Sequence, residues 1–272
     1  MSTPSLPVAF ITGVSSGIGR ATALKLKTSG YEVFGTSRRV DTGSIVDGIQ
    51  MVQLDVGDDS SVEKAVAFVM KQTGRIDLLV NNAGFGIFGG AEESSIAQAK
   101  DLFETNLFGV IRTVRAVLPI MRKQKNGRII NVSSVLGFVP SPYMALYAAS
   151  KHALEGYSQS LDHEIRTFGV RVLLVEPAYT KTSFEQNMQA SDELMPEYEK
   201  IRTAIGELIA GAMATADDPY IVADEIAKAA AAISPKLRYP AGAVARRLNW
   251  LRRLVPASSF DRGLRKRMQL AS

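Results

Sequence analysis

The feature that most constrains the fold is a glycine-rich turn between an apolar run and a helical pattern. Residues 8–12 are apolar, glycines follow at 13, 17 and 19, and residues 20–27 repeat apolar side chains at helical spacing before Ser29 and Gly30. Glycines let a backbone turn tightly, and the free amides at a helix start attract phosphate. The stretch predicts the first half of a dinucleotide-binding unit, although a glycine-rich turn alone can be purely structural. Its expected cofactor contacts are Gly13, Ser15, Ser16, Gly17, Ile18 and Gly19.

Further apolar runs, each followed by a helical pattern, predict an α/β fold. They span residues 31–36, 51–55, 76–81, 128–132 and 170–175, with a short last strand at 237–239. Strands that alternate with helices form right-handed crossovers and a parallel sheet covered on both faces. Ligands bind such sheets beyond the carboxyl ends of the strands. The residues that directly follow strands should therefore meet at one edge: Gly13, Ser37, Asp55, Asn82, Ser134 and Pro177.

The end of the second strand indicates which dinucleotide is bound. Ser37, Arg38 and Arg39 come first, and the nearest carboxylate is Asp41. An acid at this place would bind the free ribose hydroxyl of NAD, whereas arginine suits a phosphate. We therefore expect NADP(H) to be favoured over NAD(H), the alternative being a solvated basic turn. The other expected cofactor contacts follow later strands: Asp55, Val56, Asn82, Ala83, Gly84, Pro177, Thr180 and Thr182.

A tyrosine and a lysine four residues apart suggest acid–base chemistry. On a helix this spacing stacks Tyr147 and Lys151 on one face. A phenol has a pKa of about 10, and a cation held within a few Å lowers that pKa toward neutrality. By itself the pair is more often incidental. Asn106 lies in the middle of a long helical stretch, residues 95–125, where asparagine is an indifferent helix former.

Taken together, residues 12–19, the run Asn-Asn-Ala-Gly at 81–84, Ser134 and Tyr147-x-x-x-Lys151 resemble the short-chain dehydrogenase/reductase family, in its compact single-domain branch. The resemblance covers about residues 7–182. It implies a Rossmann-like three-layer sandwich with a mostly parallel sheet of about seven strands, and hydride transfer between NAD(P) and a carbonyl/alcohol pair. The sequence departs from the family after the sixth strand, where Ala178 stands in place of a common glycine.

The resemblance also implies roles for single residues. Tyr147 would be the general acid in reduction and the base in oxidation. Lys151 would lower the Tyr147 pKa and hold the nicotinamide ribose, and Ser134 would hydrogen-bond the substrate oxygen. Asn106 would hold a water in a proton relay. The family commonly associates through its two long helices, which implies a homodimer or homotetramer.

The substrate side of the sequence is apolar. Residues 182–217 form a long segment without a matching strand, of the kind that often makes a lid. Together with the Leu-Arg-Tyr run at 237–239 it looks similar to the hydroxysteroid and retinol dehydrogenase subgroups. We expect a hydrophobic carbonyl or alcohol, such as a steroid, retinoid, fatty or aromatic compound; the same residues could instead be ordinary core. The expected substrate contacts are Ser134, Leu136, Phe138, Tyr143, Tyr147, Phe184 and Met188.

Composition excludes several classes of site and predicts a cytoplasmic protein. The chain has no cysteine and two histidines, which excludes a thiolate nucleophile and a cysteine metal site and leaves no candidate metal cluster. The amino terminus lacks the pattern of a signal peptide, and no apolar run is long enough to span a membrane.

The basic charge of the chain is concentrated at its end. The net charge is +5, but residues 236–272 carry ten Lys/Arg against Asp261 alone, which is +9 and leaves −4 for the rest. We expect one catalytic domain, residues 1–241, and a basic amphipathic extension, residues 242–272. A helix packed on the body or on a sister subunit is the favoured reading of the extension. An interfacial membrane helix is the second, and nucleic-acid contact is the least expected.

The sequence therefore predicts an NADP(H)-dependent oxidoreductase that interconverts a carbonyl and an alcohol. One alternative is a dinucleotide-binding sensor or scaffold of the same fold without turnover. The other is an alcohol dehydrogenase that prefers NAD.

Overall fold

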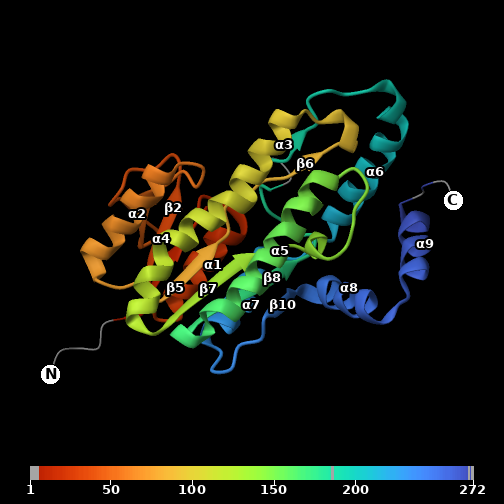
Figure 1. Cartoon of the computed structure of the whole chain (residues 1–272). Helices are drawn as coiled ribbons and strands as arrows, with labels where there is room; N and C mark the ends of the chain where they lie inside the picture. The colour runs from red at the N-terminus through yellow and green to blue at the C-terminus, as the bar shows by residue number, and fades with distance from the viewer. Residues whose placement is uncertain (1–5, 185–186, 269, 271–272) are drawn as a thin grey trace.

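A central sheet organises the chain, of which a computed structural model describes residues 6–184, 187–268 and 270. Seven strands run parallel, and the short hairpin strand β3 pairs antiparallel with β4 at one edge (Figure 1). The mostly parallel Rossmann-like sheet is thus confirmed, with a two-residue edge strand beyond the seven expected. In spatial order the strands are β10 (Arg238–Ala241), β8 (Val170–Pro177), β7 (Gly127–Val132), β5 (Leu78–Asn81), β1 (Val8–Ile11), β2 (Glu32–Ser37), β4 (Ile49–Gln53) and β3 (Ile45–Val46).

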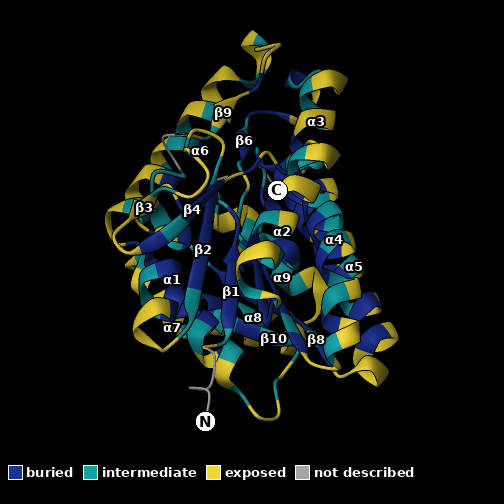
Figure 2. Cartoon of the chain, turned by 90° about the vertical axis from the view of Figure 1, so that its left-hand side faces the viewer, coloured by how far each residue is buried: buried dark blue, intermediate teal, exposed yellow. Residues whose placement is uncertain are grey.

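Helices cover both faces of this sheet because successive buried side chains of a strand point to opposite sides. Phe10 faces the core under α2 (Asp59–Thr73), α4 (Gly109–Gln124) and α5 (Ala145–Ile165). The next residue, Ile11, faces the core under α1 (Gly17–Thr28) and α7 (Pro219–Ala231). Figure 2 shows α1 and α7 on one side of the strands and α4 and α5 on the other. The three layers leave the carboxyl ends of the strands open.

The helix expected over residues 95–125 is interrupted around Asn106, the candidate functional residue in its middle. Ser95 caps α3 (Ile96–Phe103) by accepting a hydrogen bond from the Gln98 amide, and α4 follows only after a π-helical turn, η2 (Glu104–Phe108). Such turns insert one extra residue per turn and are frequent at functional sites. Asn106 is buried inside this turn.

The segment between β8 and α7 is tied to the body by a strand pair and an ion pair, both with residues about 100 positions earlier in the chain. Its strand β9 (Gln189–Ala190) pairs with β6 (Ile87–Phe88), and its helix α6 spans Pro196–Ala214. Glu93, in the 3-10 turn η1 (Ala91–Glu93), is fully buried and forms an ion pair with Arg202 of α6. The segment thus has a small strand that its sequence pattern does not reveal.

The C-terminal extension forms two helices, α8 (Gly242–Leu254) and α9 (Ala257–Arg267), which continue from the edge strand β10 (Figure 1). Arg252 fixes their position in two ways. It donates a hydrogen bond of 3.2 Å to the Phe138 carbonyl, and its guanidinium lies 5.5 Å from the centre of the Phe260 ring. Short 3-10 turns complete the fold at η3 (Val135–Gly137) and η4 (Arg166–Phe168).

Candidate active site

A cavity of about 1210 Å³ opens at the carboxyl ends of the strands. The residues after β1, β2, β4, β5, β7 and β8 line it, as expected for a ligand site in an open parallel sheet. All the cofactor contacts expected from the sequence line this cavity except Gly19, which packs beneath the glycine turn. They are Gly13, Ser15, Ser16, Gly17, Ile18, Ser37, Arg38, Arg39, Asp55, Val56, Asn82, Ala83, Gly84, Tyr147, Lys151, Pro177, Thr180 and Thr182.

The glycine turn is held by the loop after β5. Asn82 donates hydrogen bonds from Nδ2 to the carbonyls of Thr12 and Gly13, at 3.0 and 2.9 Å. The Thr12 hydroxyl in turn accepts from the amides of Asn82 and Ala83. Gly13 has a φ of +73°, and a Cβ there would lie 3.0 Å from the Ala83 backbone. The turn is therefore fixed in a conformation that only glycine adopts readily.

Helix α1 begins at this turn without a side-chain cap. The Ser16 hydroxyl makes no capping bond, and no acidic residue stands in the first turn of the helix. Free amides and the helix dipole make such an end a site for a phosphate group. The residues present therefore fit the pyrophosphate of a dinucleotide.

The far end of the cavity combines cations with one carboxylate that the sequence pattern did not reveal. Arg38 and Arg39 are exposed and line the cavity after β2. Asp41 does not line it, whereas Asp47, brought in by the β3–β4 hairpin, does. Asp47 is neutralised by Arg20, with 2.7 Å between Nη2 and Oδ2. Arg38 and Arg39 form no ion pair with the residues that the structure describes, so they set the local charge.

Ser134, Tyr147 and Lys151 meet in the middle of the cavity. The Ser134 side chain hydrogen-bonds the Tyr147 phenol, and Lys151 Nζ lies 5.7 Å from the centre of the Tyr147 ring. Burial raises the pKa of Tyr147 to about 12, although the Ser134 bond opposes this shift. Burial also lowers the pKa of Lys151 to about 8, while Glu155 opposes it.

The pKa of Tyr147 is raised, whereas its spacing from Lys151 suggests that the pKa is lowered. Both groups are shielded from water, and desolvation disfavours the phenolate and the ammonium alike. Lys151 is 6 % exposed and donates to the Val132 carbonyl at 3.0 Å. In this arrangement the phenol stays protonated at neutral pH, the state from which a proton can be given.

Asn106 locks the loop beside this group rather than lining the cavity. Its Nδ2 donates to the Phe85 carbonyl at 2.9 Å and to the Ser150 hydroxyl at 3.2 Å, and its Oδ1 accepts from the Phe85 amide at 3.1 Å. A Cβ on Gly84 would lie 2.9 Å from this Oδ1 and 3.9 Å from Lys151 Nζ. Asn106 is thus close to Lys151, and its side chain is engaged with the backbone.

A buried cluster of charges lies one helical turn beyond Lys151. Glu155 Oε2 lies 2.5 Å from Nη1 of Arg238, and Glu176 at the end of β8 forms an ion pair with the same guanidinium. The positive charge of Arg253 also acts on Glu176. Burial and the neighbouring Glu176 carboxylate raise the pKa of Glu155 to about 7, and burial raises the pKa of Glu176. Near neutral pH Glu155 is therefore only partly ionised.

The Glu155→Gln variant should lose a pH dependence of stability. Because the folded pKa is about 7 against an ordinary 4.5, the wild type loses stability as pH rises through this window, by about 3 kcal/mol in all. Glutamine cannot ionise, so urea unfolding at about pH 5 and about pH 8 should differ less in the variant. Glu164→Gln, exposed on the same helix, is the control and should keep the wild-type dependence. An unchanged dependence in Glu155→Gln would remove Glu155 as its source.

The substrate end of the cavity is apolar, but two expected contacts lie outside its wall. Leu136, Phe184 and Met188 line it with Ser134 and Tyr147. Phe138 and Tyr143 do not: the Phe138 carbonyl holds Arg252, and Tyr143 packs between Phe88 and Tyr198, with ring centres 6.3 Å apart in each pair. A further part of the wall, which the sequence pattern did not reveal, is made by α8, α9 and the end of α6; its members are Ile209, Met213, Val244, Arg247, Leu248, Leu251, Leu264, Arg267 and Met268.

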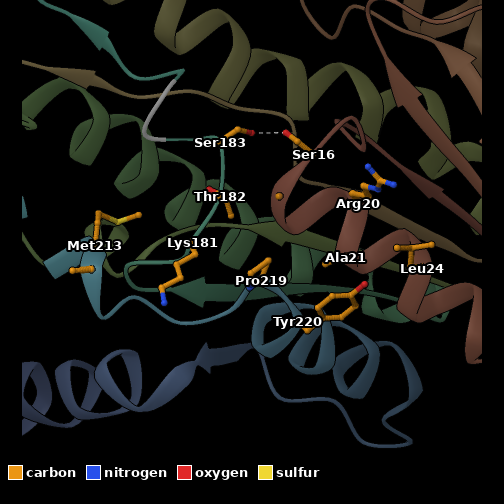
Figure 3. A pocket seen from close by; sticks show the side chains of 12 residues that line it. Ser16, Arg20, Ala21, Leu24, Lys181, Thr182, Ser183, Met213, Pro219 and Tyr220 are labelled. Carbon is orange, nitrogen blue, oxygen red and sulfur yellow. Dashed lines mark hydrogen bonds between the residues drawn. The ribbon is translucent and has the colours of Figure 1, made fainter. Parts of the chain in front are cut away.

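A second hollow of about 630 Å³ lies beside the first turn of α1 (Figure 3). Ser16 and Ser183 meet above it, with their hydroxyl oxygens 2.5 Å apart, and both also line the main cavity. Leu24 and Tyr220 close its other end, where α1 and α7 approach (Figure 3). The hollow is therefore a side branch of the same cleft.

The described part of the chain offers no metal site, because its His, Asp and Glu side chains form no group that could hold a metal ion. Nor does it contain a helix long and apolar enough to cross a membrane.

Comparison with known proteins agrees with this geometry. The short chain dehydrogenase family matches residues 7–193. Over 185 residues, 68 % of each chain, the sequence is 41 % identical to a 3-ketodihydrosphingosine reductase of Bacteroides thetaiotaomicron. A short chain dehydrogenase/reductase of Burkholderia phymatum in complex with NAD is 26 % identical, with a TM-score of 0.77 over 100 % of this chain and 98 % of the other. The structure of ElxO with NADP bound is also 26 % identical, with a TM-score of 0.72 over 86 % and 98 %.

The glycine turn, the uncapped helix and the Ser134–Tyr147–Lys151 group thus occur in a chain whose sequence and fold agree with one family. The chain belongs to the short-chain dehydrogenase/reductase family and is an oxidoreductase of that family.

Proposed function

We propose that the protein is an NADP(H)-dependent oxidoreductase that interconverts a carbonyl and an alcohol on a hydrophobic substrate. The observation that carries the proposal is the meeting of Ser134, Tyr147 and Lys151 between a phosphate-binding turn and an apolar wall. In this proposal residues 1–241 form the catalytic domain and residues 242–272 an extension over its cavity.

Each candidate catalytic residue of the chain has a separate role in this proposal. Bound NADP(H) supplies or accepts the hydride. In reduction, the Tyr147 hydroxyl gives its proton to the substrate oxygen, and in oxidation it takes that proton back. Ser134 donates a hydrogen bond to the same oxygen, and Lys151 holds the ribose hydroxyls beside Tyr147. We assign Asn106 to the proton route as the residue that holds a water linking Lys151 to solvent, because its side chain lies near Lys151.

The preference for NADP(H) rests on charge. Arg38 and Arg39 are exposed in the cavity and can hold a 2′-phosphate, because arginine forms bidentate bonds to phosphate oxygens. Asp47 would repel that phosphate, but Arg20 neutralises it. One relative in the family binds NAD and another NADP, so the assignment depends on these residues.

Replacing Arg38 by Asp should reverse the cofactor preference. The variant removes a cation and adds an acid that binds a free ribose hydroxyl, so the NADPH/NADH ratio of kcat/KM should fall by about 100-fold or more, which corresponds to roughly 3 kcal/mol. Steady-state kinetics with both cofactors measure it. Lys71→Asp on the exposed side of α2 is the control and should leave the ratio unchanged. An unchanged ratio in the Arg38 variant would refute the assignment.

The apolar wall favours a lipophilic substrate. Leu136, Phe184 and Met188 present apolar surface beside Tyr147, and one relative is named a 3-ketodihydrosphingosine reductase. A panel of steroid, retinoid, fatty and aromatic carbonyls, with small sugars as the contrast, tests this by NADPH oxidation. Turnover of the sugars alone would overturn the substrate class.

The alternatives make different predictions in the same assay. A sensor or scaffold would bind NADPH without consuming it with any carbonyl, and an NAD-preferring alcohol dehydrogenase would turn over faster with NAD. The retained Ser134, Tyr147 and Lys151 group favours the enzyme over the sensor. A homodimer or homotetramer, on the resemblance to the family, and a cytoplasmic location, on the sequence pattern, complete the proposal.

A further inference from the structure

Helix α8 uses one side to close the cavity. Gly242 and Ala245 are buried against the body, and Leu248 and Leu251 line the cavity. Arg252 holds the helix to the Phe138 carbonyl. This side accounts for the sequence expectation that the extension packs on the body.

The opposite side of α8 carries exposed apolar side chains. Trp250, the only tryptophan in the chain, is 62 % exposed, and Leu254 is 70 % exposed. Their spacing of four residues places them on one face. Within the described residues neither side chain is covered, so a large aromatic and an aliphatic group stand together in solvent.

Arginines border this face on both sides. At 3.6 residues per turn, Arg246 and Arg253 fall on one flank of Trp250 and Leu254, and Arg247 falls on the other. Helix α9, which follows α8, contains the further cations Arg262, Lys266 and Arg267, of which Arg267 lines the cavity. The extension therefore presents an apolar stripe within a strongly basic surface, which is the pattern of a helix that lies in a membrane interface.

The positive charge around Trp250 and Leu254 determines which kind of partner can cover this face of α8. A second copy docked by the same face would bring Arg246, Arg247 and Arg253 of both chains together, because a two-fold contact pairs each patch with itself. A nucleic acid would satisfy the arginines but leave the Trp250–Leu254 stripe without a partner. Anionic lipid headgroups match the arginines, and the boundary below them accepts tryptophan and leucine.

We propose that α8 and α9 dock the protein on an anionic membrane surface, with Trp250 and Leu254 inserted at the headgroup level. The cavity wall lies on the other side of the same helix, through Leu248 and Leu251. Docking therefore holds the cavity about one helix diameter, roughly 10 Å, from the bilayer surface. This makes the membrane, rather than a sister subunit, the partner of the outer face.

The single tryptophan provides a direct test. Vesicles of phosphatidylcholine mixed with phosphatidylglycerol should shift the Trp250 emission to the blue, and brominated acyl chains should quench it. Partitioning should be at least about tenfold weaker on phosphatidylcholine alone and should weaken with salt. A protein that stays in the supernatant with anionic vesicles, with unshifted emission, overturns the proposal. So does a blue shift that grows with protein concentration in the absence of lipid, because it would assign the face to a second copy.

Variants separate the apolar from the electrostatic contribution in co-sedimentation with the same vesicles. Leu254→Ser and the double variant Arg246→Glu/Arg253→Glu should each lose at least about tenfold in partitioning. Ile96→Ser, which removes a 73 % exposed side chain from α3, is the matched control and should sediment like the wild type. Thermal unfolding of each variant confirms that the fold is retained. Wild-type sedimentation of the double arginine variant would overturn the proposal, and none of these readouts depends on turnover.

Discussion

Replacing Tyr147 by Phe should lower turnover by about 10³-fold while leaving NADPH affinity within about threefold of the wild type. The phenol is the buried proton donor at the centre of the cavity, and a positioned general acid contributes about 10²- to 10⁴-fold to a rate. Phenylalanine keeps the ring and its packing against Phe184, whose centre is 5.6 Å away. Steady-state kinetics on any substrate accepted by the wild type, with NADPH titration by fluorescence, measure the two effects separately.

A second tyrosine on the same helix supplies the control. Burial also raises the pKa of Tyr157 to about 12, but Tyr157 packs against the core under α2, α4 and α5 rather than lining the cavity. Tyr157→Phe should therefore keep wild-type turnover. If Tyr147→Phe turned over at the wild-type rate, Tyr147 would not be the acid, and Lys151 would have to be tested in its place. If both variants lost turnover alike, the loss would reflect packing of the helix rather than proton transfer.

The sequence was sufficient to predict those cavity-lining residues that directly follow strands. Apolar runs and glycines are local signals, and parallel strands bring their carboxyl ends to one edge whatever the rest of the chain does. Gly13, Asp55, Asn82 and Ser134 therefore line one cavity as expected. The link from Asn82 to the glycine turn also follows from this geometry, because β5 lies directly beside β1.

Side-chain direction in irregular segments could not be predicted in the same way. Tyr143 has a φ of +62° and turns toward Phe88 and Tyr198, away from the cavity. A period of two or 3.6 residues assigns faces only within strands and helices. Asp47 reaches the cavity through a two-residue strand, β3, too short to leave a periodic signal.

The contribution of the extension was missed for another reason. Leu251 and Leu264 lie in helical patterns in the sequence. Their place in the cavity wall, however, depends on loops more than 100 residues earlier in the chain, which line the same cavity. Nothing local encodes that pairing. Burial likewise reverses the expected shift of the Tyr147 pKa, since spacing from Lys151 reports the nearby charge and not the loss of water.

Replacing Gly19 by Ala should disable cofactor binding although Gly19 does not line the cavity. A Cβ at this position would lie 2.1 Å from the Gly13 carbonyl oxygen and 2.5 Å from Asn82 Nδ2. Neither atom can move at low energetic cost, because the Asn82 side chain is hydrogen-bonded to the carbonyls of both Thr12 and Gly13. The glycine turn must therefore move away from α1, which displaces the amides proposed to bind the pyrophosphate.

The expected cost is about 3 kcal/mol in the free energy of unfolding, typical of overpacking, together with at least about a 100-fold loss of NADPH affinity, since each tenfold corresponds to about 1.4 kcal/mol. Urea unfolding and NADPH titration, carried out where circular dichroism shows the variant folded, measure the two quantities.

Gly211→Ala in α6 is the matched control, because a Cβ there meets nothing within 4 Å. It should keep NADPH affinity and gain up to about 1 kcal/mol in stability from its helix propensity. A Gly19→Ala protein that is destabilised but binds NADPH normally would separate the packing of this turn from cofactor recognition. The pyrophosphate would then have to be assigned to other amides.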